Sequence, residues 1–195
     1  RRCREGLRHR VAAGDPRGRP DPLYVGRPDP ADGEWLMDIR IAAVGKVKER
    51  YLRDGIAEYT KRLGRYGHID IVEAREERAP ETLSEKEMEQ VKEREGASLL
   101  KLCRPGACRV ALAIEGDRLS SEELAHYIRE LETGGVSRMD FMIGGSLGLS
   151  DEVLASAERR LSFSPMTFPH QLMRLILLEQ LYRAAKINRG EVYHK

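Results

Sequence analysis

Apolar residues follow two alternating patterns along this chain from residue 37 onward. Short apolar runs bounded by glycine or polar residues are typical of buried strands, and longer segments with apolar residues three or four apart are typical of helices. The predicted strands are Ile39–Val44, Ile69–Val72, Arg109–Ile114, Met139–Ile143 and Leu161–Phe163. The predicted helices span Glu49–Leu63, Ser84 to about Leu102, Ser120 to just before Gly134, a short segment after Ser150, and about Gln171 to Ile187. This alternation predicts an α/β domain with a largely parallel sheet.

Three of the predicted helices begin with capping signals. Ser84 with Glu87, and Ser120 with Glu123, have the Ser-x-x-Glu spacing of a capping box. In that motif the serine and glutamate side chains each accept a hydrogen bond from the other residue's backbone amide. Ser150 stands before two acidic residues, which the positive end of a helix dipole favours.

The last predicted helix is apolar around most of its circumference. Its apolar residues are Leu172, Met173, Leu175, Ile176, Leu177, Leu178, Leu181, Tyr182, Ala184, Ala185 and Ile187. A helix of this kind is buried on more than one side. If one side packs on the sheet and the other on a second subunit, the protein is a homodimer with two-fold symmetry. The alternative is a helix that lies centrally within a single chain.

The first 36 residues differ in composition from the rest. Five of the nine prolines and eight arginines fall there, without a periodic apolar pattern. We therefore predict a disordered, non-native leader over residues 1–36, with Met37 as the natural start of a domain spanning 37–195. A transit peptide is the rival interpretation, and the acidic residues and lack of serine in the segment argue against it.

The domain that remains without the leader has no net formal charge. The 195 residues include 34 basic and 32 acidic side chains, for a formal charge of +2. Without the eight arginines and six acidic residues of the leader, 26 of each sign remain. A neutral domain has weak nonspecific affinity for RNA, because phosphate neutralisation supplies most of that binding.

The sequence argues against a membrane span, a secreted location and several kinds of binding site. No apolar run approaches the roughly 18 residues that predict a membrane span. The three cysteines and the lack of a secretory signal predict a reducing, cytoplasmic location. Cys103 and Cys108 lack a second ligand pair, so we expect no metal site and predict that both are small buried apolar residues. The nucleotide-binding motifs GxGxxG and GxxxxGK[ST] are absent from the sequence, and no convincing triad spacing indicates a hydrolase.

Candidate chemistry lies where the predicted strands end, because ligands of open α/β sheets bind beyond the carboxyl ends of strands. Gly116 follows the third strand, and Gly144 and Gly145 follow the fourth. Glycines there allow close approach of a ligand to the backbone, although a tight turn explains Gly144–Gly145 equally well. After the fifth strand, Pro165 and Pro169 bracket a loop that could clasp a flat heterocycle.

At these strand ends the sequence resembles the RlmH family, the ribosomal RNA large-subunit pseudouridine N3-methyltransferases of the SPOUT class. The resemblance extends over 37–195. It is carried by the runs Ala42–Lys46, Ile143–Ser146, Leu161–Arg174, Glu179–Ala184 and Tyr193–Lys195.

This resemblance implies a single SPOUT-type domain with a parallel sheet and a C-terminal trefoil knot. It also implies a homodimer that uses S-adenosylmethionine to methylate N3 of a pseudouridine in helix 69 of 23S rRNA, within the assembled ribosome. The implied cofactor-binding residues are Leu112, Gly116, Gly144, Gly145, Phe163, Ser164, Pro165, Met166, Thr167 and Phe168.

The implied catalytic residues are His170, Arg183, Tyr193 and His194, and the implied substrate-binding residues are Arg174, Lys186 and Lys195. Which of them takes the imide proton of the base stays open. Without the resemblance, His170 would be expected to be a capping or core histidine, and Arg174 a partner of a nearby carboxylate. We also expect the acidic run Glu73–Glu95 to be a solvated surface. A SPOUT methyltransferase of another RNA and a noncatalytic ribosome-associated factor are the rival functions.

Overall fold

Five parallel strands form the centre of the molecule. The computed structural model describes residues 37–77, 80 and 82–192. The strands are β1 (Asp38–Val44), β2 (Ile69–Ala74), β3 (Cys108–Arg118), β4 (Arg138–Ile143) and β5 (Arg159–Ser162). Their order in the sheet is β2-β1-β4-β3-β5, and every neighbouring pair is parallel. The predicted α/β class with a parallel sheet is therefore confirmed, and β4 inserts between two strands that precede it in the sequence.

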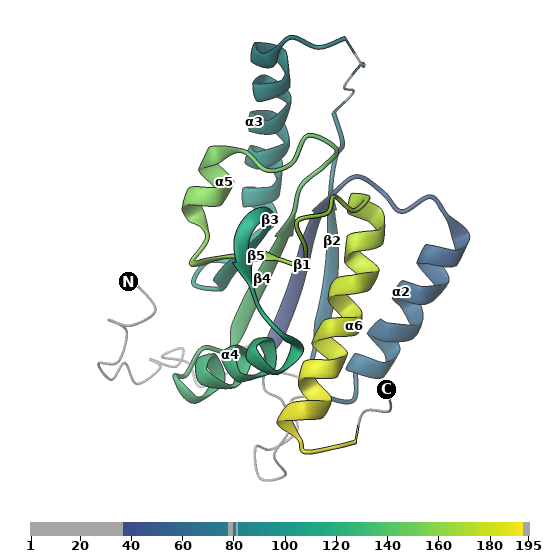
Figure 1. Ribbon diagram of the computed structural model, residues 1–195, viewed down its shortest axis with the longest axis vertical. Helices are drawn as coiled ribbons and strands as arrows, with labels where there is room; N and C mark the ends of the chain where they lie inside the picture. Colours follow the sequence, from purple (N-terminus) through teal and green to yellow (C-terminus); the bar gives the residue numbers. More distant parts are fainter. Residues whose placement is uncertain (1–36, 78–79, 81, 193–195) are drawn as a thin grey trace, which may run out of the picture.

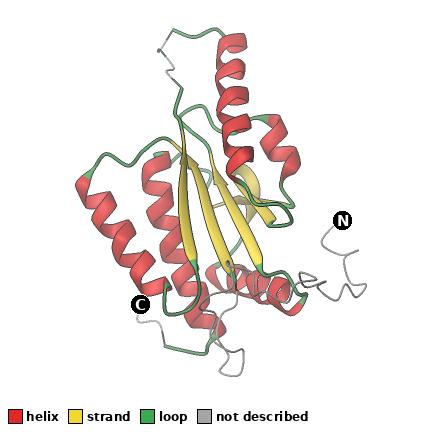
Figure 2. Cartoon of the chain, turned by 180° about the vertical axis from the view of Figure 1, so that it is seen from behind, coloured by secondary structure: helices red, strands yellow, loops and turns green. Residues whose placement is uncertain are grey.

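Helices cover both faces of this sheet, as Figures 1 and 2 show from opposite sides. The helices are α2 (Arg50–Leu63), α3 (Glu85–Leu102), α4 (Ser121–Thr133), α5 (Asp151–Ser156) and α6 (His170–Asn188). On one face α6 lies between α2 and α4, and on the other α3 packs with α5. Parallel strands need such covering layers because both of their faces are apolar.

The capping signals in the sequence are realised in the structure. Both Ser-x-x-Glu motifs form complete capping boxes at the starts of α3 and α4. The Ser150 side chain accepts a hydrogen bond from the amide of Val153 at the start of α5. These bonds satisfy amides that the first helical turn leaves without an intrahelical partner, so the starts of three helices are fixed locally.

The core explains why α6 is apolar nearly all round. The largest cluster of buried side chains lies between the sheet and the layer of α2, α4 and α6, and Leu177, Leu178 and Leu181 are fully buried in it. Leu175 packs on Gly55 of α2, where an added Cβ would lie 3.1 Å from the leucine side chain. Most of the apolar circumference is thus covered within one chain. The pattern alone does not require a second subunit, and the homodimer stays a prediction.

The strand boundaries differ from the predicted ones by one to four residues, and the ends of β3 and β5 matter most for the carboxyl edge. β3 continues through Gly116 to Arg118 instead of ending there, because it is bulged between Leu112 and Asp117 and then resumes pairing with β5. β5 ends at Ser162, so Phe163 belongs to the loop that follows. A bulge adds residues that no periodic pattern of apolar positions reveals.

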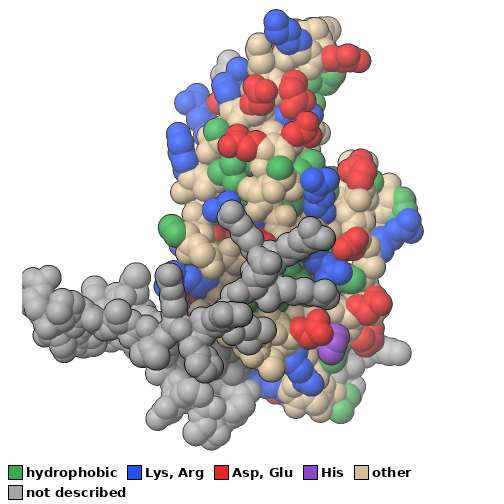
Figure 3. All heavy atoms as spheres, turned by 90° about the vertical axis from the view of Figure 1, so that its left-hand side faces the viewer, with side chains coloured by type: hydrophobic (Ala, Val, Ile, Leu, Met, Phe, Trp, Pro, Cys, Tyr) green, Lys and Arg blue, Asp and Glu red, His purple; other side chains and the backbone are tan. Residues whose placement is uncertain are grey.

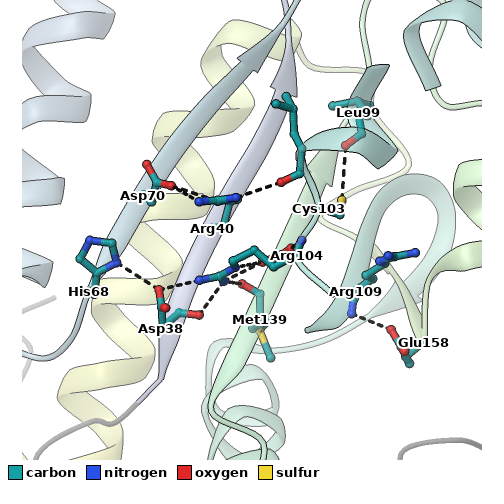
Figure 4. A network of polar contacts seen from close by, with 12 residues as sticks. Asp38, Arg40, His68, Asp70, Leu99, Cys103, Arg104, Arg109, Met139 and Glu158 are labelled. Carbon is teal, nitrogen blue, oxygen red and sulfur yellow. Dashed lines mark hydrogen bonds and ion pairs between the residues drawn. The ribbon is translucent and has the colours of Figure 1, made fainter. Parts of the chain in front are cut away.

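Ion pairs close the amino edge of the sheet (Figure 4). The Arg104 guanidinium contacts the buried Asp140 carboxylate at 2.6 Å and Asp38 at 2.7 Å. Arg40 bonds Asp70 and the carbonyl oxygen of Leu102. These contacts pair charged side chains of β1, β2 and β4 with Arg104 or with one another at the amino edge. Cys103 and Cys108 are buried free thiols, as predicted.

Candidate functional site

The carboxyl ends of β1 and β4 lie side by side at one edge of the sheet. Ala43 pairs with Ile143, so the turns that follow these strands, Val44–Gly45 and Gly144–Gly145, start next to each other. An added Cβ on Gly145 would lie 3.1 Å from the Val44 side chain, which confirms how closely the two turns approach. The end of β4, which was singled out from the sequence, therefore lies beside the end of β1, which was not.

Glycine suits the close packing at each of these turns. Gly45 has φ +80°, a left-handed conformation that side chains disfavour. A Cβ on Gly144 would lie 2.5 Å from the carbonyl oxygen of Gly148, and one on Gly145 would lie 2.7 Å from Oε2 of Glu95. We call Gly45, Gly144 and Gly145 the glycine floor. Protein atoms fill the space beside each of these glycines, so the two turns pack tightly at the carboxyl edge.

Gly116 and Leu112 have a different setting. A Cβ on Gly116 would lie 2.7 Å from the backbone of Arg160, so this glycine is needed for the close pairing of β3 with β5. Leu112 pairs with Leu161 at the start of the bulge. Both residues border the carboxyl edge through strand pairing, and the structure assigns Gly116 at least this packing role.

The loop between β5 and α6 crosses the same edge. Phe163 packs against the main core, while Pro165, Met166 and Thr167 are exposed, Met166 at 71%. The Ser164 hydroxyl accepts a hydrogen bond from the Met166 amide at 3.0 Å, which tightens the turn. The two prolines further restrict the backbone. The result is a partly fixed, open loop that leads directly into α6.

His170 is the first residue of α6 and points toward the glycine floor. Its side chain is 15% exposed, and its Nε2 lies 4.0 Å from Oε1 of Glu76. Nε2 has no hydrogen-bond partner among the residues that the structure describes. Burial lowers the pKa of His170 below its usual value, and the nearby Arg174 acts in the same direction while Glu76 opposes it. A largely neutral imidazole with an unused nitrogen can accept a proton from a ligand.

Arg174 fixes the turn after β1 to α6. Its fully buried guanidinium donates to the carbonyl oxygens of Val44 at 2.6 Å and Gly45 at 2.7 Å, and it pairs with Glu73 at 2.8 Å. Burial lowers the pKa of Arg174, while Glu73 raises it. The predicted partnership with a carboxylate is confirmed, but the partner lies on β2. A guanidinium bonded in this way is placed to position Gly45 and not to contact RNA, in contrast to the substrate contact predicted from the resemblance.

One acidic residue in the run Glu73–Glu95 was predicted wrongly. Glu95 is only 4% exposed, because α3 packs it against the Gly145 turn. Its Oε1 accepts a hydrogen bond from the Glu77 amide at 2.9 Å, and its Oε2 has no hydrogen-bond partner in the described parts of the chain. The spacing held a signal for this burial, since Glu95 falls between Val91 and Leu99 on the apolar stripe of α3.

The remaining predicted residues lie away from the glycine floor. Arg183 pairs with Glu179 at 2.7 Å, and Lys186 pairs with Glu191 at 2.6 Å. At the helical rise of 1.5 Å per residue, Arg183 is about 20 Å along α6 from His170. A single chain therefore does not bring Arg183 or Lys186 to His170. Tyr193, His194 and Lys195 lie outside the described residues.

The arrangement fits a ligand with a flat ring and a positively charged part. The loop 163–169, with Pro165, Met166 and Thr167 exposed, could receive a planar heterocycle beside the glycine floor. Two buried polar atoms next to the floor, His170 Nε2 and Glu95 Oε2, have unused hydrogen-bonding capacity. The residues described form no group of three metal-ligating side chains. No helix among them is long and apolar enough to cross a membrane.

A family model and named relatives identify the family of the chain. Residues 37–194 match the model of the family described as "Predicted SPOUT methyltransferase". The chain is 58% identical to the ribosomal RNA large subunit methyltransferase H of Bacillus pumilus over 159 residues, which is 82% of this chain and all of that protein. It is 57% identical to the Clostridioides difficile protein of the same name over the same shares. Among solved structures, a probable methyltransferase from Bordetella pertussis Tohama I matches with TM-score 0.48 and 15% identity, over 77% of this chain and 95% of that one.

Proposed function

Because the chain belongs to the SPOUT methyltransferase family, and within it to the RlmH family, we propose that it methylates 23S rRNA with S-adenosylmethionine as the donor. The target is N3 of a pseudouridine in helix 69 of the assembled ribosome, in the cytoplasm. The match carries this proposal, since it spans the whole length of relatives named ribosomal RNA large subunit methyltransferase H. It also includes each strand end that forms the carboxyl edge.

The proposed cofactor site consists of the backbone around the glycine floor and the loop after β5. Its residues are Leu112, Gly116, Gly144, Gly145 and 163–168. S-adenosylmethionine, when bound, supplies a methyl group on a positively charged sulfur. The fixed backbone of this edge would orient the donor and exclude water, and alignment of this kind supplies much of the catalysis of a displacement.

His170 is the residue we propose to take the imide proton of the base. Its Nε2 is unpartnered among the described residues, and burial keeps the imidazole largely neutral by lowering its pKa. A neutral imidazole accepts a proton, which leaves the nucleophilic nitrogen free to attack. Arg183, Tyr193 and His194 are the further catalytic candidates, as groups that would stabilise the negative charge developing on the base.

A second subunit would place these candidates in one site. Within one chain, Arg183 is about 20 Å along α6 from His170, so both can act on one base only if a partner chain supplies the C-terminal end of α6. We therefore propose a homodimer in which the region around Arg183, Lys186 and the tail through Lys195 reaches the partner's glycine floor. We also propose that the C-terminal part of the domain is threaded as a trefoil knot.

The charge of the surface favours recognition of a structured substrate. Acidic and basic side chains are interspersed where the described residues form the face shown in Figure 3. A protein of this kind gains little affinity from phosphates alone. Contacts from both subunits, including Lys186 and Lys195, would then add up on the assembled ribosome and not on naked RNA.

A methylation assay on pseudouridylated ribosomes tests the proposal. The full chain and a variant lacking 193–195 are each incubated with labelled S-adenosylmethionine, and the modified nucleotide is located by mass mapping. We expect label at a helix 69 pseudouridine with the full chain, and a strong loss with the truncated one. Label on another RNA would overturn the assigned substrate, and absence of S-adenosylmethionine binding in calorimetry would indicate a noncatalytic ribosome-associated factor.

A further inference from the structure

Two carboxylates lie against the glycine floor, one at each of its two turns. Oε2 of Glu76 would lie 3.0 Å from a Cβ on Gly45, and Oε2 of Glu95 would lie 2.7 Å from one on Gly145. The segment after β2 joins them, since Glu76 contributes its carboxylate and the next residue, Glu77, donates its amide to Glu95. We call Glu76 and Glu95 the acid pair.

The members of the acid pair differ in exposure. The Glu76 side chain is 37% exposed, whereas Glu95 is 4% exposed and its Oε2 is buried without a hydrogen-bond partner among the described residues. A buried carboxylate oxygen without a donor is costly to keep, and proteins retain such groups where a proton or a ligand completes them. The Oε2 atom of Glu95 can therefore still accept a hydrogen bond from a ligand, and it lies beside the Gly145 turn of the candidate site.

The surroundings leave the acid pair with excess negative charge. Arg174 is the nearest cation on the β1 side, but its guanidinium is already bonded to Glu73 and two carbonyl oxygens. On the α3 side, Arg94 lies 3.4 Å from Glu77 and not against Glu95. A neutral His170 adds no positive charge. Burial and the neighbouring Glu76 and Glu77 carboxylates raise the pKa of Glu95. The hydrogen bond from the Glu77 amide and the nearby charge of Arg94 lower it and do not reverse the direction.

We propose that the acid pair binds the ammonium group of the methyl donor's amino-acid end. The inference rests on the proposed function and assigns residues outside those expected to hold the cofactor. An ammonium group offers both the charge and the N–H donors that Glu95 Oε2 lacks, whereas the sulfonium has no N–H to donate. The rest of the donor then extends from the Gly145 turn toward the exposed loop 163–169.

Calorimetric binding of three compounds separates this role from other roles. S-adenosylmethionine has the ammonium and the sulfonium, S-adenosylhomocysteine keeps only the ammonium, and 5′-methylthioadenosine has neither. In Glu95→Gln the amide oxygen can still accept the Glu77 N–H, but the charge is gone. We expect the affinity for the first two compounds to fall about tenfold or more, with the affinity for 5′-methylthioadenosine unchanged.

Three other outcomes overturn the assignment. A parallel loss for all three compounds shows that Glu95 only supports the fold of the site. A loss for S-adenosylmethionine alone shows that the carboxylate faces the sulfonium. Unchanged affinities show that it faces neither charge. If the wild-type chain binds none of the three, the proposed function fails, and this result is distinct from a failure of the acid pair.

Two further variants keep the test valid. Glu93→Gln removes an exposed carboxylate two residues earlier on α3 and is expected to leave all three affinities unchanged. If Glu95→Gln does not fold, Glu76→Gln tests the more exposed member of the pair, with the same expected order of losses. Circular dichroism and gel filtration establish that each variant is folded before its affinities are compared.

Discussion

The guanidinium of Arg174 donates a hydrogen bond to the carbonyl oxygen of Gly45 at 2.7 Å and so joins the start of α6 to the turn after β1. The two residues are 129 positions apart in the sequence. The same guanidinium also bonds the Val44 carbonyl and Glu73, so one side chain connects β1, β2 and α6 next to His170.

Removing this connection is expected to destabilise the protein. In Arg174→Met two buried carbonyl oxygens lose their donor, and each buried acceptor left without a partner costs about 1–3 kcal/mol. We expect the free energy of unfolding, measured by urea denaturation, to fall by about 3 kcal/mol. Arg50→Met removes an exposed i,i+4 ion pair with Asp54 and should cost at most about 0.5 kcal/mol. Equal losses in the two variants would contradict the structural role of Arg174.

Gly144→Ala is expected to disrupt the glycine floor. The added Cβ would lie 2.5 Å from the Gly148 carbonyl oxygen, so the turn after β4 must shift. We expect S-adenosylmethionine affinity, measured by calorimetry, to fall more than about tenfold, with a loss of stability of about 1–3 kcal/mol. Gly64→Ala is the control, because Gly64 has φ −57° and its nearest contact to an added Cβ is 3.4 Å. Undiminished binding by Gly144→Ala would exclude this turn from the cofactor site.

His170 is expected to make stability depend on pH. Because burial lowers its pKa in the folded state, the unfolded chain binds the proton more readily. The contribution to stability is therefore complete above the usual histidine pKa of about 6.5, and it is lost as the pH falls through the lower folded value.

The pH dependence can be measured in the absence of any ligand. Urea denaturation between pH 5 and pH 7.5 should show this loss in the wild type, and His170→Gln should reduce it. His126→Gln, which changes a histidine whose side chain is 71% exposed, should leave the pH dependence as in the wild type. If the His170 variant keeps the full slope, the imidazole does not titrate as its burial implies.

Charge reversal at the C-terminal end of α6 should separate substrate binding from cofactor binding. Lys186→Glu and Arg183→Glu are expected to lower ribosome methylation about tenfold at physiological salt, because contacts to phosphate are lost. Their S-adenosylmethionine affinity should stay unchanged. Lys92→Glu on α3 makes the same charge change on the other face of the sheet and should leave methylation intact. Equal losses of methylation and cofactor binding would count against a substrate role.

Local signals in the sequence predicted most of the fold. The apolar periods located all five strands and all five helices of the described residues to within a few positions, and the Ser-x-x-Glu spacings fixed the starts of α3 and α4. Such features succeed because propensity and capping act between residues close together in the chain. The glycines at the ends of β1 and β4 were visible for the same reason.

The composition of the candidate site was only partly visible in the sequence. Gly116 was expected to follow a strand, but the bulge in β3 places it within one. Glu95 was expected to be solvated, although its spacing with Val91 and Leu99 indicated a place on the apolar stripe. Charge dominated that expectation, because isolated carboxylates are seldom buried.

The sequence by itself determined the order of strands and helices, the α/β class, the strand ends where a ligand could bind, and the resemblance to the RlmH family. Only the tertiary structure decided that β4 lies between β1 and β3, which brings Gly45 beside Gly145. It alone decided that Arg174 bonds Gly45 and Glu73 while Glu95 faces Gly145. These pairings join residues far apart in the chain. They depend on strand order and on burial, which local patterns do not encode.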